Sequence, residues 1–153
     1  MQQLIVIEGP TASGKTALSV ALAKALNTVV LSADSRQFYK ELSIGTAKPT
    51  KEEMEGIPHY FIDSHSISTP VSAAQYEAEA IELIRGELAQ YPKLVLVGGS
   101  GMFIDALCLG LDPIPADPDL QDLLRKELEQ KGLEPLLEEL KNNDPEFYKQ
   151  VDK

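Results

Sequence analysis

Short apolar runs alternate along this chain with segments of helical periodicity. Short apolar runs predict four strands, over residues 4–9, 28–33, 59–63 and 93–99, of which the first and the fourth are expected to be buried. Apolar positions at helical spacing predict a helix over 15–26, a short helix from Thr50 to Gly56, and a third helix from Ser72 through about Gln90. The second and third of these helices begin with a pair of residues at the spacing of a capping box, Thr50 with Glu53 and Ser72 with Gln75. This alternation predicts an α/β fold, with a parallel sheet flanked by helices.

A phosphate-binding motif joins the first predicted strand to the first helix. Its two glycines, Gly9 and Gly14, let the backbone wrap a phosphate, and the helix N-terminus adds free amides. Lys15 would neutralise phosphate oxygens, and Thr16 would ligate a Mg²⁺ ion that bridges them. The core is therefore predicted to be P-loop NTPase-like. The candidate diphosphate- or nucleotide-binding residues are Gly9, Pro10, Thr11, Ala12, Ser13, Gly14, Lys15 and Thr16.

The pattern changes after the fourth predicted strand. Residues 111–119 form a connection rich in Pro and Asp, and the chain beyond them is acidic and helical in character. We therefore expect two parts, a P-loop α/β core over residues 1–112 and a helical segment over residues 113–153.

The loops that follow parallel strands lie in one row at the edge of a sheet, and the second of these loops begins with Asp34. A carboxylate here has three possible roles: a cap of the turn, a ligand of Mg²⁺, or a general base beside the bound phosphate. Ser35, Arg36 and Gln37 follow, and their hydroxyl, planar cation and amide suit a nucleobase or a backbone phosphate. Lys48 adds either a phosphate contact or a solvated charge.

The fourth predicted strand ends in Gly98 and Gly99 and not in an acidic residue. Glycines here let a phosphate or another backbone approach closely. A conventional ATPase would have an Asp or Glu at this point, so its absence argues against motor-type hydrolysis. Ser100 either contacts a ligand or serves the turn. His59, at the edge of the third strand, is expected to be packed or solvent-facing and not catalytic.

Composition argues against a general nucleic-acid-binding protein, a disulfide-bonded protein and a membrane protein. The chain has a net charge of −10, although its first fifty residues hold five Lys or Arg against three Asp or Glu. An acidic total argues against broad nonspecific binding of nucleic acid but leaves room for a local basic cleft. The single cysteine, Cys108, excludes a disulfide within the chain, and the apolar runs are too short for a membrane span or a signal peptide. We expect a cytoplasmic monomer that does not enter a membrane.

Five motifs follow one another along the chain: GPTASGKT at 9–16, ADSRQFY at 33–39, IGTAKP at 44–49, IPHYFID at 57–63 and LVGGSGMFIDAL at 96–107. In this order and spacing they resemble the tRNA dimethylallyltransferase family, also called tRNA isopentenyltransferases. The resemblance covers essentially the whole chain. It implies transfer of a dimethylallyl group from dimethylallyl diphosphate to the exocyclic amine of the adenosine on the 3′ side of the anticodon, with release of pyrophosphate.

The resemblance also implies roles for individual residues. The loop would grip the diphosphate, while Lys15, Thr16 and Mg²⁺ absorb charge as pyrophosphate leaves. Asp34 would accept the amine proton or orient the amine towards the allylic carbon. The implied catalytic residues are Asp34, Lys15 and Ser100. The partner is the anticodon stem-loop of tRNA, whose adenine must leave its stack, and its implied contacts are Asp34, Ser35, Arg36, Gln37, Ser100 and Gln121.

The chain departs from the family pattern at several points. Ser100 and Phe103 stand where the family usually has a threonine and a tyrosine, and Tyr60 stands where a second histidine is frequent. Gln121 replaces a common arginine, for which Arg125, one helical turn on, is a possible substitute. The chain also has about half the family's usual length. We therefore expect it to bind diphosphate but to transfer prenyl groups to tRNA poorly.

Other functions stay open on the sequence alone. Adenylate isopentenyltransferase uses the same donor with a free adenine nucleotide, although GTAKP and GGSG favour the tRNA branch. A small-molecule kinase would share the loop and the Asp34 position, but Arg36, Arg85 and Arg125 form no obvious lid over ATP. The last alternative is a phosphate-binding module that has lost catalysis.

Overall fold

The computed structural model describes residues 2–112 and 117–152, and the chain forms two compact units, Met1–Leu111 and Asp112–Lys153. The first unit contains β1 (Gln3–Glu8), α1 (Lys15–Leu26), β2 (Val30–Ala33), α2 (Lys51–Met54), β3 (His59–Tyr60), α3 (Ala73–Arg85), β4 (Lys93–Gly98) and α4 (Gly101–Leu109). The second unit contains α5 (Pro118–Lys131), α6 (Glu134–Asn143) and α7 (Pro145–Tyr148). Part of the expected Pro- and Asp-rich connection, residues 113–116, lies outside the described residues.

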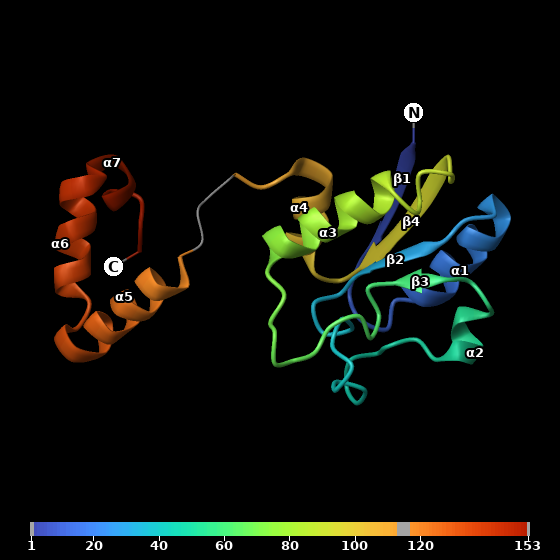
Figure 1. Ribbon diagram of the computed structural model, residues 1–153, viewed down its shortest axis with the longest axis horizontal. Coiled ribbons are helices and arrows are strands. Elements are labelled where there is room, and N and C mark those ends of the chain that lie inside the picture. Colours follow the sequence, from blue (N-terminus) through green and yellow to red (C-terminus); the bar gives the residue numbers. More distant parts are fainter. Residues whose placement is uncertain (1, 113–116, 153) are drawn as a thin grey trace. The chain divides into compact units, whose positions relative to one another are not determined.

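The four strands form one parallel sheet in the order β1-β4-β2-β3 (Figure 1). Helix α1 packs on one face of the sheet, and α3 and α4 pack on the other. The strand registers align both Glu8 and Ala33 with Gly98, so β1, β2 and β4 end at the same level. The loops that follow these strands therefore lie side by side, and the predicted parallel sheet flanked by helices is confirmed.

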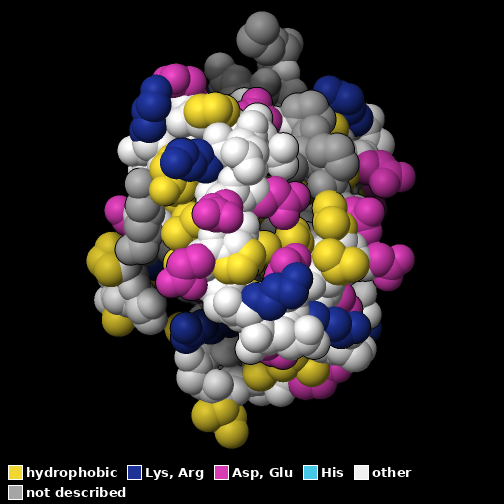
Figure 2. Space-filling model, turned by 90° about the vertical axis from the view of Figure 1, so that its left-hand side faces the viewer, with side chains coloured by type: hydrophobic (Ala, Val, Ile, Leu, Met, Phe, Trp, Pro, Cys, Tyr) yellow, Lys and Arg dark blue, Asp and Glu magenta, His cyan; other side chains and the backbone are white. Residues whose placement is uncertain are grey.

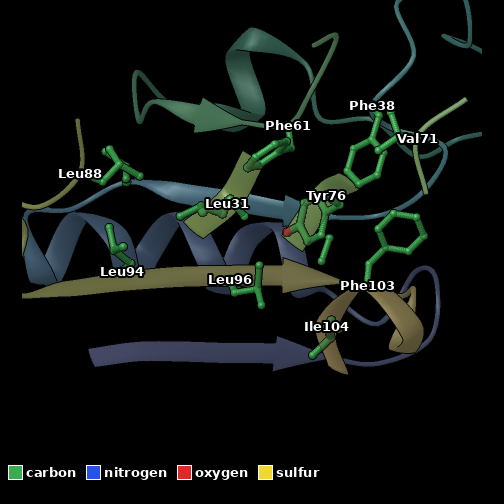
Figure 3. Close-up of a cluster of buried hydrophobic side chains, with 13 residues drawn as sticks. Leu31, Phe38, Phe61, Val71, Tyr76, Leu88, Leu94, Leu96, Phe103 and Ile104 are labelled. Carbon is green, nitrogen blue, oxygen red and sulfur yellow. The ribbon is translucent and has the colours of Figure 1, made fainter. Parts of the chain in front are cut away.

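The apolar side chains of the strands are divided between the two faces. In β2, Leu31 and Ala33 belong to the core under α3 and α4, whereas Val30 belongs to the core under α1. Four aromatic rings, with centroids 4.8 to 6.2 Å apart in each contacting pair, pack together under α3 and α4 (Figure 3): Phe38, Phe61, Tyr76 and Phe103. This aromatic cluster joins the segment after β2 to the first turns of α3 and α4.

Two strands differ from the prediction. Strand β3 covers only two residues, because Phe61 has a φ of 63° that ends the extended conformation, and its ring lies in the aromatic cluster. Strand β1 pairs only with β4 in the described sheet, and Val6 is 40% exposed. The prediction that β1 is buried was wrong, because β1 lies at the sheet edge.

Local capping sets the helix boundaries. Thr50 and Glu53 form the predicted capping box, in which each side chain accepts a hydrogen bond from the backbone N–H of the other. At α3, Ser72 accepts from the backbone N–H of Gln75, but the Gln75 amide bonds a residue within the helix instead of completing the box. Helix α3 ends at Arg85 rather than near residue 90.

The second unit consists of helices α5, α6 and α7, and none of their residues is buried. Four large apolar side chains are exposed on these helices: Leu120, Leu123, Leu128 and Phe147. On the face of the molecule drawn in Figure 2, acidic, basic and apolar side chains intermingle. Within the described ranges, no helix is both long enough and apolar enough to cross a membrane.

Gly98 permits a close approach of β2 and β4. A Cβ atom at this position would lie 2.2 Å from the carbonyl oxygen of Ala33, and that backbone cannot move aside as a flexible side chain would. At the neighbouring Gly99, the nearest atom to a Cβ would be the carbonyl oxygen of Gly9 at 3.5 Å, which is an ordinary contact. Only the first of these two glycines is therefore required by packing.

We expect Gly98→Ala to lower the free energy of unfolding by about 2 kcal/mol or more, because the added methyl group would force β2 away from β4. Gly99→Ala is the matched control and should change the free energy of unfolding by less than about 0.5 kcal/mol. Urea denaturation followed by circular dichroism measures both variants. Equal stabilities of the two variants would contradict the close approach.

Candidate functional site

The phosphate loop, residues 9–16, presents the N-terminus of α1. Gly14 precedes the helix with a φ of 85°, a conformation that favours glycine. Ala12 has a φ of 65°, which is uncommon for a residue with a side chain and is often found at functional sites. Among the described residues, no side chain caps α1, and its first turn contains no acidic residue. The first amides of the helix are therefore open to an anion.

Lys15 lies at the first position of α1, where a positive charge is unfavourable unless an anion is beside it. Its Nζ donates a hydrogen bond to the Pro10 carbonyl oxygen at 2.6 Å. A phosphate oxygen would offer the same ammonium group a charged acceptor and a stronger hydrogen bond. This placement supports the predicted role of Lys15, which stays a prediction.

Two cavities meet at the end of β2. The phosphate-loop cavity has a volume of about 530 Å³ and is lined by residues 11–17 together with Asp34, Gln37, Ala47, Lys48, Glu53 and Glu55. The polar cavity has a volume of about 280 Å³ and is lined by Thr11, residues 34–36, Gly45, Thr46, Gly99 and Ser100. Thr11 and Asp34 line both cavities. The structure thus brings together the site residues that the sequence predicted after β1, β2 and β4.

Asp34 follows β2 directly and is half-buried. Its Oδ1 accepts a hydrogen bond from the backbone N–H of Arg36 at 3.0 Å, so Asp34 does cap the turn. This bond also fixes the direction of the carboxylate. Because an ionised carboxylate has two oxygens and about four acceptor sites, Asp34 can cap the turn and still accept a proton or a hydrogen bond from a ligand.

Ser100 links the ends of β2 and β4. Its hydroxyl accepts from the backbone N–H of Ser35 at 3.0 Å and donates to the Ser35 hydroxyl at 3.2 Å. Its own backbone N–H donates to the Ala33 carbonyl oxygen at 3.3 Å. Ser100 therefore serves the turn, on a wall of the polar cavity, and its contact with a ligand stays a prediction. Arg36 lies exposed on the same wall.

Gln37 braces the loop 45–48. Its Nε2 donates to the carbonyl oxygens of Thr46 and Ala47 at 3.3 and 3.1 Å, and its Oε1 accepts from the Ser32 hydroxyl at 3.0 Å. Both amide hydrogens are therefore bound to backbone oxygens. In this arrangement Gln37 holds a wall shared by the two cavities, while its predicted contact with tRNA stays a prediction.

Lys48 anchors the same loop from its other end. Its side chain is only 9% exposed, and Nζ donates to the Tyr39 carbonyl oxygen at 2.8 Å and to Asp63 Oδ1 at 2.6 Å. The carboxylate of Asp63 neutralises the ammonium charge. Lys48 is thus not the solvated charge that the sequence allowed, and its charge is already paired on the wall of the phosphate-loop cavity.

The phosphate-loop cavity contains part of a ligand set for a divalent cation. Thr16 and Asp34 line it, and their side chains carry the hard oxygen atoms that Mg²⁺ prefers. Among the described residues, no group of three His, Cys, Asp or Glu could enclose a metal ion. The residues therefore fit a cation that keeps several waters and takes its other ligands from substrate phosphates.

Two residues considered for tRNA binding lie in the second unit. Gln121 is exposed on α5. Arg125, one helical turn further, is also exposed and lies 3.8 Å from Asp122, measured between Nη1 and Oδ1. Contact of either residue with tRNA stays a prediction.

Several cavity residues had no role predicted from the sequence. Gly45 and Thr46 line the polar cavity, and Ala47, Glu53 and Glu55 line the phosphate-loop cavity. The sequence signal for the first three was the motif IGTAKP, which contains them. In the structure Gly45 has a φ of 76°, a conformation that favours glycine. The two glutamates belong to the capped helix α2 and its end, where acidic residues are ordinary on stability grounds alone.

Sequence comparison places this chain among prenyl-transferring relatives. A family model described as IPP transferase matches residues 37–153. The tRNA dimethylallyltransferase of Cytophaga hutchinsonii is 51% identical over 150 residues, covering 97% of this chain and 49% of that protein. The tRNA dimethylallyltransferase 1 of Bacteroides thetaiotaomicron is 44% identical over 153 residues, covering 99% of this chain and 50% of that protein. The chain spans about half the length of the curated relatives it matches.

Solved structures give the same result. The full-length tRNA isopentenylpyrophosphate transferase of Bacillus halodurans matches with a TM-score of 0.69 and 38% identity, over 99% of this chain and 51% of that one. A eukaryotic dimethylallyltransferase acting on tRNA matches with a TM-score of 0.81 and 27% identity, over 99% of this chain and 38% of that one. These matches confirm the predicted P-loop NTPase-like fold.

We expect Gln37→Leu to lower the free energy of unfolding by about 1 to 3 kcal/mol, because two carbonyl oxygens and a buried hydroxyl lose their partner. Hydrogen exchange over residues 41–48 should also become faster. Gln90→Leu is the matched control, since the Gln90 amide bonds only the exposed Glu87 carbonyl, and it should change stability by less than about 0.5 kcal/mol. An unchanged rate of hydrogen exchange over residues 41–48 in Gln37→Leu would show that the hydrogen bonds of Gln37 are not needed to hold the loop.

Proposed function

Because this chain belongs to the IPP transferase family, as its motifs predicted, we propose that it acts in the transfer of a dimethylallyl group from dimethylallyl diphosphate to tRNA. The acceptor is the exocyclic amine of the adenosine on the 3′ side of the anticodon, and pyrophosphate is released. The observation that carries the proposal is the position of Asp34, which lines both the phosphate-loop cavity and the polar cavity. A donor in one cavity and an acceptor in the other would meet at this carboxylate.

The diphosphate of the donor occupies the phosphate-loop cavity in this proposal. The open amides of α1 and the ammonium group of Lys15 supply donors for its oxygens. When the allylic carbon–oxygen bond breaks, the leaving pyrophosphate gains negative charge. Donors that are already in place before the bond breaks stabilise this charge without reorganisation.

The adenine amine enters from the polar cavity. As its nitrogen forms a bond to the allylic carbon, it loses a proton, which the Asp34 carboxylate accepts. The Arg36 backbone N–H holds the carboxylate in place through Oδ1. The nitrogen–carbon bond forms, the carbon–oxygen bond breaks, the proton moves to Asp34, and the electron pair leaves with pyrophosphate.

A divalent cation, proposed to be Mg²⁺, is suggested by the charge of the phosphate-loop cavity. Asp34, Glu53 and Glu55 bring three carboxylates to a cavity that would also hold a diphosphate. Lys24 compensates Glu55, and Lys48 is already paired with Asp63. Thr16 would hold the cation. When bound, it would offset phosphate charge during departure of the leaving group.

The tRNA partner is proposed from the relatives, whose names or descriptions specify tRNA. Arg36 on the wall of the polar cavity would contact a phosphate or a base. The alternative acceptor named in the sequence analysis, a free adenine nucleotide, would need no contact with nucleotides next to the reacting adenosine. A kinase reaction is less favoured, because β4 ends in Gly98, which approaches Ala33, and carries no acidic residue for Mg²⁺.

We expect labelled dimethylallyl diphosphate to bind this chain, and label to move to an anticodon stem-loop RNA rather than to AMP. Lys15→Ala should weaken donor binding about tenfold or more, because it removes a charge-assisted contact to phosphate. Asp34→Asn should leave donor binding within about threefold of the wild type but lower transfer at least about 100-fold, the range for loss of a general base. Equilibrium dialysis and scintillation counting of the RNA measure the two effects.

The controls separate the alternatives. Label on AMP would favour the adenylate reaction, and tight ATP binding without donor binding would favour a kinase. Asp105→Asn, which changes an exposed carboxylate on α4 away from both cavities, should leave binding and transfer unchanged. Transfer that persists in Asp34→Asn would exclude Asp34 as the base.

A further inference from the structure

A third, small cavity lies beneath the phosphate loop. Its volume is about 30 Å³, enough for one water molecule. Polar groups from separate elements line it: Thr16 and Ser19 from α1, Ser32 and Asp34 from β2 and its end, Gln37, and His59 from β3. An apolar cavity of this size stays dry, whereas a cavity lined by several polar groups retains a water molecule.

His59 contributes the one buried side-chain nitrogen or oxygen, among the described residues, that has no hydrogen-bond partner: Nε2. Its other ring nitrogen, Nδ1, lies 2.8 Å from the Ile57 carbonyl oxygen. Since a carbonyl oxygen can only accept, Nδ1 carries the hydrogen. Burial lowers the pKa of His59, so the ring is neutral near pH 7. Nε2 is therefore an unprotonated acceptor that needs a donor.

Apart from Thr16, the neighbouring polar side chains that could donate already use their hydrogens elsewhere. The Ser19 hydroxyl donates to the Thr16 carbonyl oxygen at 2.8 Å, and the Ser32 hydroxyl donates to Gln37 Oε1 at 3.0 Å. The Gln37 amide donates to the loop 45–48, as described above. Asp34 is the only carboxylate on the cavity wall, and it too can only accept when ionised. The cavity thus brings together two acceptors, His59 Nε2 and the Asp34 carboxylate, with the Thr16 hydroxyl as the one side-chain donor on its described wall that no other bond uses.

We propose that a buried water molecule in this cavity donates one hydrogen bond to His59 Nε2 and the other to the Asp34 carboxylate. A water molecule has two hydrogens, one for His59 Nε2 and one for the Asp34 carboxylate. Its oxygen can also accept a hydrogen bond from the Thr16 hydroxyl. His59 is then a positioning residue, which acts on Asp34 through the water. The inference rests on the proposed function only for what Asp34 does in the reaction.

The water would fix the carboxylate at one point, while the Arg36 backbone N–H fixes it at another, through Oδ1. A carboxylate held at two points has a defined direction towards the polar cavity, which a general base requires. The buried position of His59 is thereby explained without a direct contact between the imidazole and a substrate. It also explains why His59, half-buried beneath the loop, is neither solvent-facing nor part of the apolar core.

Two measurements on the 153-residue chain test the proposal. In a crystal structure at about 1.5 Å or better, a water should lie within hydrogen-bond distance of both His59 Nε2 and an Asp34 oxygen. In nitrogen-resolved NMR of the two histidines, His59 should carry its hydrogen on Nδ1 at pH 7. Asp34→Asn should lower the pKa of His59 by about 0.3 unit or more, since loss of a nearby negative charge disfavours the imidazolium. His65→Gln assigns the two signals.

Asp105→Asn is the matched control, and it should leave the pKa of His59 unchanged. A dry cavity, a protein hydroxyl bound directly to Nε2, or a pKa of His59 that ignores Asp34 would each overturn the proposal. If Asp34→Asn does not fold, the crystal structure of the wild type decides alone. Neither readout requires prenyl transfer, so a bridging water without transfer would reject the proposed function and leave the inference standing.

Discussion

The close approach of Ala33 and Gly98 determines where the candidate site lies. Because Gly98 has no side chain, β2 and β4 pair up to their last residues, and the loops after both strands start together. The Ala33 carbonyl oxygen then accepts from Ser100, and the Ser100 hydroxyl bonds Ser35. A Cβ at residue 98 would separate these loops, and with them the walls of the polar cavity. The site thus depends on a backbone contact as much as on its polar side chains.

The second constraint is the loop 45–48, which has little apolar packing of its own. Gln37 binds its carbonyl oxygens from the β2 side, and Lys48 ties its end to Asp63 and to the Tyr39 carbonyl. Two polar anchors therefore replace a hydrophobic core at this point. Since the loop lines both cavities, the same anchors hold a wall of the phosphate-loop cavity and a wall of the polar cavity.

The parts of this arrangement that were predictable from the sequence depend on local chemistry. The phosphate loop, the parallel sheet and the capping box at Thr50 follow from residue spacing, and the structure contains all three. The burial of β1 and the length of β3 were predicted wrongly, because strand order and the turn at Phe61 arise from tertiary packing. The partners of Gln37 and Lys48, and the cavity at His59, depend on which loops meet, which spacing along the chain does not reveal.

The arrangement of charges favours a leaving-group role for the phosphate loop over phosphoryl transfer to water. The loop offers amides and Lys15 to an anion, while the adjacent β4 carries no carboxylate to orient a hydrolytic water. Asp34, the acidic residue that lines both cavities, follows the end of β2. In the proposed reaction, negative charge departs towards the loop as a proton moves to Asp34. Lys15 and the amides of α1 would thus receive the negative charge of the leaving group, and Asp34 would receive the proton, in the same step.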